Sequence, residues 1–457
     1  MIPSSMKAMV LKGHGGIDQL MYQDVPVPQP REGEVLVQVT ATAKNNTDRK
    51  AREGLYPTKK GEMTSFQMGG KPTLTFPRIQ GADIVGRIVA VGTGVSEQRI
   101  GERGLLDFNI YADNRTDINL TPDYYGHGAD GGYAEYVALP SDQFHHIPNP
   151  DLADAELASM GMCSYQTAYH MLTSANIQAG ERVLVTGASG GVGTALIQLC
   201  RIIGAIPYAL SQKDKADPLL ELGAEAVLDR TDMDSFVDRV KAETGGKPLD
   251  AVMDLVGGDM TDRFIDAMIF DMNVRSTYPR LSIAGASGGN ISEILWTRIY
   301  LYQVQIFGVS HGTREEAEQL MRWIRSGDLK PVLHGAFRLS ELHRAEEYFV
   351  NRGSNYLGKI VIVPDANMDA DALADLSPDR VALVTGGDQA AIVGAYSHLK
   401  NLKVDQDIPI ELVIVGSDPD TVNDTATRLI DAASRHLDRQ VRFIGAMERI
   451  EALLRSK

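Results

Sequence analysis

Residues 182–205, RVLVTGASGGVGTALIQLCRIIGA, set the fold class of this 457-residue chain. The apolar run RVLV has the character of a buried strand, a glycine-rich turn follows it, and an amphipathic helix comes next. Glycines in such a turn let backbone amides approach a pyrophosphate, and the amino end of the helix favours its charge. The stretch therefore predicts a dinucleotide-binding turn. The residues that we assign to it are Gly187, Ser189, Gly190, Gly191, Val192 and Gly193.

The sequence on either side of this turn extends the prediction to a whole domain. Downstream, the short apolar runs IPYAL, EAVLD, LDAVMDLVG and RLSIAGAS alternate with helical stretches, which predicts right-handed crossovers and a parallel sheet. Upstream, short strand-like runs are punctuated by glycine and proline. We therefore expect an α/β protein with a β-rich domain over residues 1–155, completed by about 310–364, and a doubly wound Rossmann domain over 156–309.

The residues after the second predicted strand bear on the choice of cofactor. An NAD-binding enzyme usually has an acidic residue there, but IPYAL is followed by SQKDK. Ser211 with Lys213 or Lys215 offers a hydroxyl and a positive charge to a 2′-phosphate, while Asp214 falls past the expected position. The pattern favours NADPH, with Ser211 and Lys215 as its ligands; a solvated charged loop is the alternative.

Composition excludes several classes of function. The net charge of −15 argues against a nucleic-acid partner and against an anionic membrane surface. We find no apolar run of membrane-spanning length and no apolar core of a signal peptide. The two cysteines, Cys163 and Cys200, provide neither a disulfide framework nor a four-thiolate zinc site. A reducing cytoplasm is the expected location.

Several ordered motifs carry a family resemblance that spans Met6 to Pro364: NNTDRKAREGLYP, FPRIQGADIVGRIVAVGTGV, DGGYAEYVALP, VTGASGGVG and LGKIVIVP. This part of the chain resembles the medium-chain dehydrogenase/reductase superfamily and, within it, the zinc-independent quinone oxidoreductase (zeta-crystallin-like) branch. The resemblance implies a GroES-like catalytic domain beside the Rossmann domain. It also implies Gly285 and Lys359 as further cofactor-binding residues, and a homodimer or higher oligomer joined through the strand in LYQVQIFGVS.

The same resemblance identifies the positions at which zinc-dependent relatives have their zinc ligands. Asn45 stands where zinc-dependent relatives have a cysteine, Gly81-Ala82-Asp83 replaces a Gly-His-Glu triplet, and Cys163 alone retains a ligand type. Catalytic zinc requires three protein ligands, which this set does not supply. Residues 105–127 contain no cysteine for a structural zinc site. We therefore predict no metal, and we expect His127 to be a surface or capping histidine.

Without a metal, hydride transfer to a quinone or an α,β-unsaturated carbonyl is the favoured chemistry, because such acceptors delocalise the incoming charge. The resemblance implies Tyr56 as a candidate proton donor, with a packing or lid role as the alternative. It places Asn45 and Asp48 on the floor of the pocket. Two other functions stay open: a metal-free carbonyl or alcohol dehydrogenase, and a non-catalytic NADPH-binding scaffold or redox sensor.

Two segments fall outside the family pattern. Residues 58–75 form an insertion beside the expected cleft, either a lid or a plain surface loop. After an Asp/Ala-rich linker at 365–379, residues 380–457 predict a small additional α/β module. This module is similar to the second half of a ParA/MinD-type ATPase but lacks a phosphate-binding loop, so we do not assign ATP binding. It is either a docking module for assembly or a protein partner, or a fusion appendage without a role.

Overall fold

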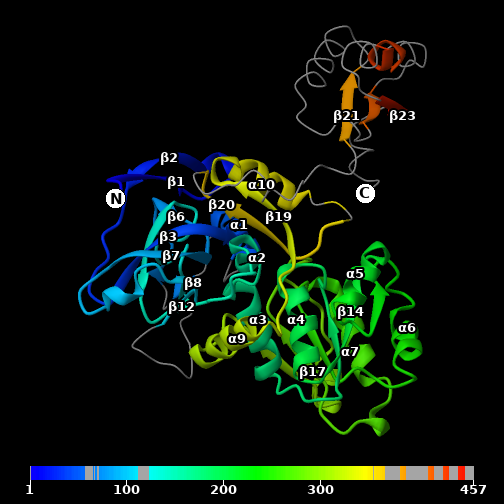
Figure 1. Cartoon of the computed structure of the whole chain (residues 1–457). Coiled ribbons are helices and arrows are strands. Elements are labelled where there is room, and N and C mark those ends of the chain that lie inside the picture. Colours follow the sequence, from blue (N-terminus) through cyan, green and yellow to red (C-terminus); the bar gives the residue numbers. More distant parts are fainter. Residues whose placement is uncertain are drawn as a thin grey trace. The chain divides into compact units, whose positions relative to one another are not determined.

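The structure is a computed structural model of the whole chain, and its architecture is shown in Figure 1. The chain divides into two compact units, Met1–Ala374 and Asp375–Lys457. The insertion at 58–75 lies largely outside the residues that the structure describes, and so does most of the second unit. The described residues are 2–56, 65, 67–68, 71–111, 123–351, 353, 355–365, 381–386, 410–415, 426–431 and 441–447.

The catalytic part of the first unit is built on a seven-stranded sheet whose longest strand is β3 (Glu34–Ala43). Strands β12 (Phe144–His146), β8 (Arg103–Leu106) and β7 (Asp83–Val91) lie on one side of β3, and β20 (Lys359–Val363) and β19 (Leu333–Arg338) lie on the other. Strand β11 (Tyr136–Pro140) also pairs with β3. The late strands therefore complete an early sheet (Figure 1), and Lys359, the first residue of β20, donates a hydrogen bond to Asn45, which precedes α1 (Asn46–Glu53).

The second sheet of this unit has six parallel strands in the order β15-β14-β13-β16-β17-β18. Helices including α4 (Gly191–Ile202), α7 (Thr261–Ile269) and α9 (Arg314–Ser326) pack around it (Figure 1). Counted along the chain, this order is 3-2-1-4-5-6, the arrangement of the Rossmann fold. The predicted fold class is therefore confirmed. The strand bounds are β13 Arg182–Val185, β14 Ile206–Ser211, β15 Ala226–Asp229, β16 Ala251–Asp254, β17 Arg280–Ile283 and β18 Gln305–Gly308.

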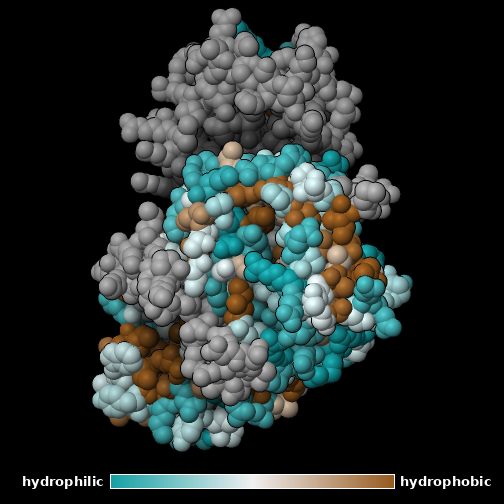
Figure 2. Space-filling model, turned by 90° about the vertical axis from the view of Figure 1, so that its left-hand side faces the viewer, coloured by the Kyte–Doolittle hydropathy of each residue, from teal (hydrophilic) through white to brown (hydrophobic). Residues whose placement is uncertain are grey.

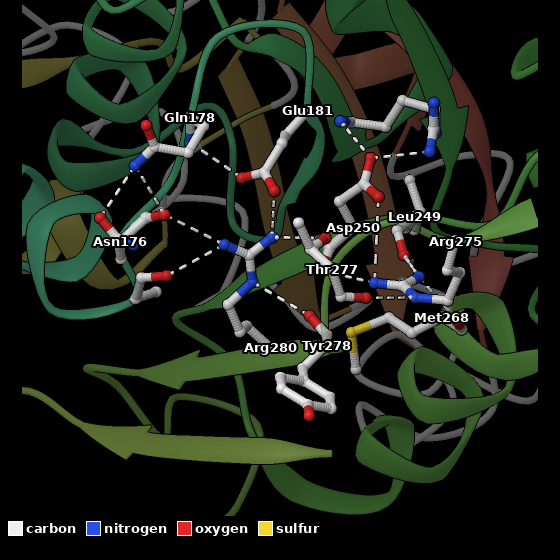
Figure 3. A network of polar contacts seen from close by, with 12 residues as sticks. Asn176, Gln178, Glu181, Leu249, Asp250, Met268, Arg275, Thr277, Tyr278 and Arg280 are labelled. Atoms are coloured by element: carbon white, nitrogen blue, oxygen red, sulfur yellow. Dashed lines mark hydrogen bonds and ion pairs between the residues drawn. The ribbon is translucent and has the colours of Figure 1, made fainter. Parts of the chain in front are cut away.

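A network of buried arginines holds the amino ends of these strands (Figure 3). Arg280 pairs with Glu181 at 2.5 Å. Asp250 accepts from the backbone of Arg182 and pairs with that arginine's side chain at 2.8 Å, while Arg275 donates to backbone carbonyls on the same side. These contacts lie at the amino ends of the strands, whereas the glycine turn lies at the carboxyl ends. They stabilise the domain and leave the carboxyl ends free for ligand binding.

The second unit contains three parallel strands among its described residues, β21 (Val381–Gly386), β22 (Ile410–Val415) and β23 (Val441–Met447).

On the face of the molecule shown in Figure 2, the coloured residues are mainly hydrophilic, with separate hydrophobic areas among them. None of the helices in the described part of the chain is both long and apolar enough to span a membrane.

Candidate active site

The glycine turn lies at the carboxyl end of β13, beside β16. Gly187 has a φ of 55°, in the left-handed region that favours glycine. A Cβ on Gly193 would lie 2.6 Å from Ala188 Cα, so α4 packs too closely on the turn to allow a side chain there. The strand order reverses between β13 and β16, and dinucleotides bind at such a switch point in open α/β sheets. The turn residues therefore lie where a dinucleotide is expected.

Three of the other predicted cofactor residues follow or end strands of the same sheet, at the carboxyl ends where the glycine turn also lies. Ser211 is the buried last residue of β14, and Lys215 follows it in the next turn. The ammonium of Lys215 lies 3.4 Å from Ser189 Oγ, which joins the loop after β14 to the glycine turn. A Cβ on Gly285 would come within 3.0 Å of Leu255 Cα, so the chain after β17 approaches the chain after β16 closely. Cofactor contact by these residues stays a prediction.

Two of the positions that match zinc ligands, Asn45 and Cys163, lie together in space with Asp83, the residue after the third matched position, Ala82. Asn45 Nδ2 donates to Asp83 Oδ2 at 2.9 Å, and the backbone amide of Cys163 donates to Asp83 Oδ1 at 2.8 Å. The ammonium of Lys359 donates to Asn45 Oδ1 and to Ser164 Oγ, the latter at 3.0 Å, and lies 3.3 Å from Asp83 Oδ2. An ammonium group thus points at the oxygens that a cation would use. Lys359 was expected among the cofactor-binding residues, and a cofactor contact remains a prediction.

This arrangement does not fit a zinc ion. Of the three matched positions, only Cys163 carries a side chain of the type that zinc prefers, because Ala82 has no donor atom and Asn45 has an amide. The remaining donors are an amide and one carboxylate, and that carboxylate already accepts from three groups. Across the described ranges, no three His, Cys, Asp or Glu side chains come together in a group that could hold a metal ion.

A chain of hydroxyl groups runs beside this cluster. Tyr56 donates its hydroxyl hydrogen bond to Thr47 Oγ1 at 2.9 Å, and Thr47 Oγ1 lies 2.9 Å from the hydroxyl of Tyr124. Burial raises the pKa of both tyrosines, so both stay protonated at neutral pH. The sequence prediction named Tyr56 but missed the other two. Thr47 had a signal in NNTD, two residues after Asn45, whereas nothing in the local sequence marks Tyr124.

Asp48 lies under this chain and fixes the start of α1. Its Oδ2 accepts from the Asn45 backbone amide at 2.9 Å and from the hydroxyl of Tyr133 at 3.0 Å. The residue is buried, and burial raises the pKa of its carboxyl group. These contacts make Asp48 a positioning group for Asn45 in this structure.

Two buried histidines complete the surroundings of the hydroxyl chain. The expectation that His127 is a surface or capping residue is wrong: its side chain is fully buried, 2.8 Å from Asp123 Oδ1 and 2.6 Å from Ser65 Oγ. Burial is possible because both ring nitrogens have partners. The ring of His311 lies 5.6 Å from that of Tyr124, and burial lowers its pKa to about 4, so it is neutral at pH 7.

The sheet order, the glycine turn and the second, β-rich domain define a two-domain dehydrogenase or reductase. Comparison with known proteins gives the same class. Residues 31–149 match the family described as alcohol dehydrogenase GroES-like domain, and residues 191–326 match the family described as zinc-binding dehydrogenase. The chain belongs to the medium-chain dehydrogenase/reductase superfamily.

Individual relatives carry names of two kinds. The crystal structure of a putative alcohol dehydrogenase from Sinorhizobium meliloti 1021 is 44% identical, with a TM-score of 0.75 over 80% of this chain and 98% of that one. A quinone oxidoreductase from Rattus norvegicus is 28% identical over 78% of this chain and 98% of its own length. An NAD-dependent alcohol dehydrogenase from Sulfolobus acidocaldarius is 26% identical over 74% of this chain and 95% of its own.

Proposed function

We propose that this protein is an NADPH-dependent oxidoreductase that reduces a quinone or an activated alkene by hydride transfer and uses no zinc. The observation that carries the proposal is the side-chain set at and beside the matched zinc positions. Asn45 and Asp83 are hydrogen-bonded to each other and to the ammonium of Lys359, and Ala82 offers no metal ligand. An alcohol dehydrogenase that polarises its substrate with a metal needs a different set.

The hydroxyl chain supplies what a conjugated acceptor requires. NADPH provides a hydride when bound at the glycine turn. A quinone or enone that accepts it develops negative charge on its carbonyl oxygen, and hydrogen-bond donors placed nearby stabilise that charge. Tyr56 is protonated and bonded to Thr47, which in turn contacts Tyr124. Tyr56 can donate a hydrogen bond or a proton to the acceptor when its O–H turns from Thr47 to the substrate oxygen, and the other two hydroxyls lie beside it.

The preference for NADPH rests on the loop after β14. Lys215 lies against Ser189 and so brings a positive charge to the glycine turn, while Lys213 and Asp214 are exposed on the same loop. A 2′-phosphate gains from such charges and a free ribose hydroxyl does not. A comparison of kcat/KM for NADPH and NADH tests this. A clear preference for NADH, as in the name of the Sulfolobus relative, would reject it.

A metal-free carbonyl or alcohol dehydrogenase is the second candidate, because the relative at 44% identity is called a putative alcohol dehydrogenase. The test is NADPH oxidation by chelator-treated protein with a benzoquinone, an enone, an enoyl-CoA and an aldehyde. Turnover of the enone with its carbonyl retained supports the first candidate, and reduction of the aldehyde supports the second. Cofactor binding without any turnover supports the third reading, a scaffold or redox sensor.

We also propose a homodimer that joins through β18, the outermost strand of the Rossmann sheet. The helix before it, α8 (Trp296–Leu301), exposes large apolar side chains, with Trp296 70% exposed and Leu301 67%. An unpaired strand edge beside such a patch favours pairing with a second copy. Light scattering after size exclusion tests the dimer. The same measurement after deletion of residues 365–457 tests whether the second unit acts in assembly.

A further inference from the structure

The side chain of Lys359 is held more completely than a surface lysine. The residue is 3% exposed and is the first of β20. Its ammonium has three oxygen partners, one each from Asn45, Asp83 and Ser164. A buried ammonium is stable only when its charge and its hydrogens are satisfied, and this set satisfies both.

Lys359 in turn stabilises its buried partners, Asp83 above all. Asp83 is fully buried, and its carboxylate accepts from two neutral groups, Asn45 Nδ2 and the Cys163 amide. Lys359 is the cation within hydrogen-bond distance of that carboxylate among the contacts of the described residues. Carboxylate, amide and hydroxyl oxygens together are also the ligands that hard metal ions take. The three oxygens thus form a cation-binding set whose cation belongs to the chain itself.

The backbone beside Lys359 joins the glycine turn. The Gly358 amide donates to Ser189 O at 2.8 Å, and Gly358 pairs with Gly190 as an isolated β-bridge. A Cβ on Gly191 would come within 3.2 Å of Lys359 Cγ and nearer still to its Cδ. The lysine stem therefore occupies the space that a side chain at the start of α4 would need. Lys359 therefore contacts both the three-oxygen set, through its ammonium, and the predicted cofactor turn, through its stem.

We propose that the Lys359 ammonium is a built-in cation that fills the Asn45, Asp83 and Ser164 oxygen set, so that the site binds no metal ion while Lys359 is present. Lys359 is then a positioning residue: it neutralises Asp83 and fixes Asn45 against the turn. This inference deepens the metal-free part of the proposed function and rests on it only there. Its tests measure binding and stability, so it can fail while NADPH-dependent reduction stands, and the reverse also holds.

The first experiment measures uptake of Mn²⁺ by the full chain and by Lys359→Ala, followed by desalting and metal analysis. We expect none to remain on the unaltered protein and about one ion per chain on the variant, with a thermal stabilisation of the variant that saturates with metal concentration. Adding Asp83→Asn to the variant should abolish the uptake. Lys44→Ala is the matched control: it also removes a buried ammonium, but Glu346 keeps Arg52 as its partner at 2.9 Å, so no cation site opens.

The second experiment does not depend on metal uptake. Lys359→Met keeps the stem and removes the charge, which leaves Asp83 buried without a cation. We expect Lys359→Met to melt at a clearly lower temperature than the unaltered chain, and the double variant with Asp83→Asn to recover part of the loss. Stoichiometric metal on the unaltered chain, or a Lys359→Ala variant that takes up no metal, would overturn the proposal. So would a double variant that melts below Lys359→Met.

Discussion

Replacement of Gly191 by alanine tests whether the start of α4 is fixed by the Lys359 side chain. A Cβ at position 191 would lie 2.8 Å from Ser164 Oγ and nearer still to Lys359 Cδ. Carbon atoms in ordinary contact are about 3.5–4.0 Å apart, so the lysine stem must move by roughly 1 Å. It cannot move freely, because its ammonium is bonded to Asn45, Asp83 and Ser164.

The cost of this collision can be worked out from its parts. Overpacking of a closely packed site costs about 1–3 kcal/mol. Weakening one hydrogen bond of a charged group adds about 1.5–3 kcal/mol, and the preference of a helix for alanine over glycine returns up to about 1 kcal/mol. The expected loss for Gly191→Ala is therefore about 1.5–6 kcal/mol. At about 2 °C or slightly more per kcal/mol, the melting temperature should fall by roughly 3–15 °C.

Gly190→Ala is the control, because the same turn offers a glycine with room beside it. The nearest heavy atom to a Cβ there is Gly187 O at 3.5 Å, and the φ of Gly190 is −84°, which alanine adopts without strain. Scanning calorimetry of the cofactor-free proteins should show a change of about 1 °C or less for this variant. A Gly191→Ala protein that melts with the unaltered chain, or with Gly190→Ala, would refute the reasoning.

Three further predictions concern the proposed chemistry and the pH dependence of stability. Tyr56→Phe should lower kcat for enone or quinone reduction by about 10²–10⁴-fold with little change in melting temperature; an effect on KM alone would argue for packing. Lys215→Ala should raise KM for NADPH by about 10- to 100-fold and leave KM for NADH unchanged, since a hydrogen bond to a charged group contributes about 1.5–3 kcal/mol. Lys213→Ala, at the exposed lysine, is the control, and equal losses for both cofactors in Lys215→Ala would contradict the prediction. Burial raises the pKa of Asp107 to about 7, so the folded protein favours the protonated carboxyl group. The stability that this protonated form contributes is complete below the ordinary pKa of 3.8 and is lost as pH rises through the folded pKa of about 7. Asp107→Asn should therefore gain stability relative to the unaltered chain at about pH 8, by at most about 4 kcal/mol, in urea unfolding at several pH values; parallel pH profiles would count against it.

The fold was predictable because its signals are local. The strand, turn and helix in residues 182–205 predict the Rossmann domain, and the spacing of the apolar runs after residue 205 predicts its parallel sheet. The match of Asn45 and Cys163 to zinc-ligand positions of relatives came from the family resemblance of the short motifs around them. These features depend on neighbours within a few positions, where strand and helix periodicity act.

The rest of the site depends on contacts that the sequence does not announce. Lys359 meets Asn45 across 314 positions, and nothing in LGKIVIVP shows that its ammonium reaches a carboxylate in the early sheet. Tyr124 meets Thr47 across 77 positions. His127 appeared to be a surface residue, because burial of an imidazole depends on partners such as Ser65, 62 positions away. Tertiary contact decides all three.

These contacts explain how helix α1 is held at both of its ends. At the amino end of α1, Asn45 is bonded to the Lys359 ammonium and to Asp83. At the carboxyl end, Arg52 pairs with Glu346 of α10 (Leu342–Val350) at 2.9 Å.

The second pair belongs to a buried group, since Lys44 also contacts Glu346 at 2.9 Å. Burial alone would raise the pKa of Glu346, but Lys44 and Arg52 together hold it below its ordinary value. Its ion pairs are therefore present above about pH 4.5 and are lost as pH falls through the lower folded pKa. Helix α1 carries Thr47 and leads directly to Tyr56, so ion pairs at both ends fix the hydroxyls that the proposed chemistry uses. The Glu346 ion pairs that hold the carboxyl end of α1 thus make this part of the fold less stable at acid pH.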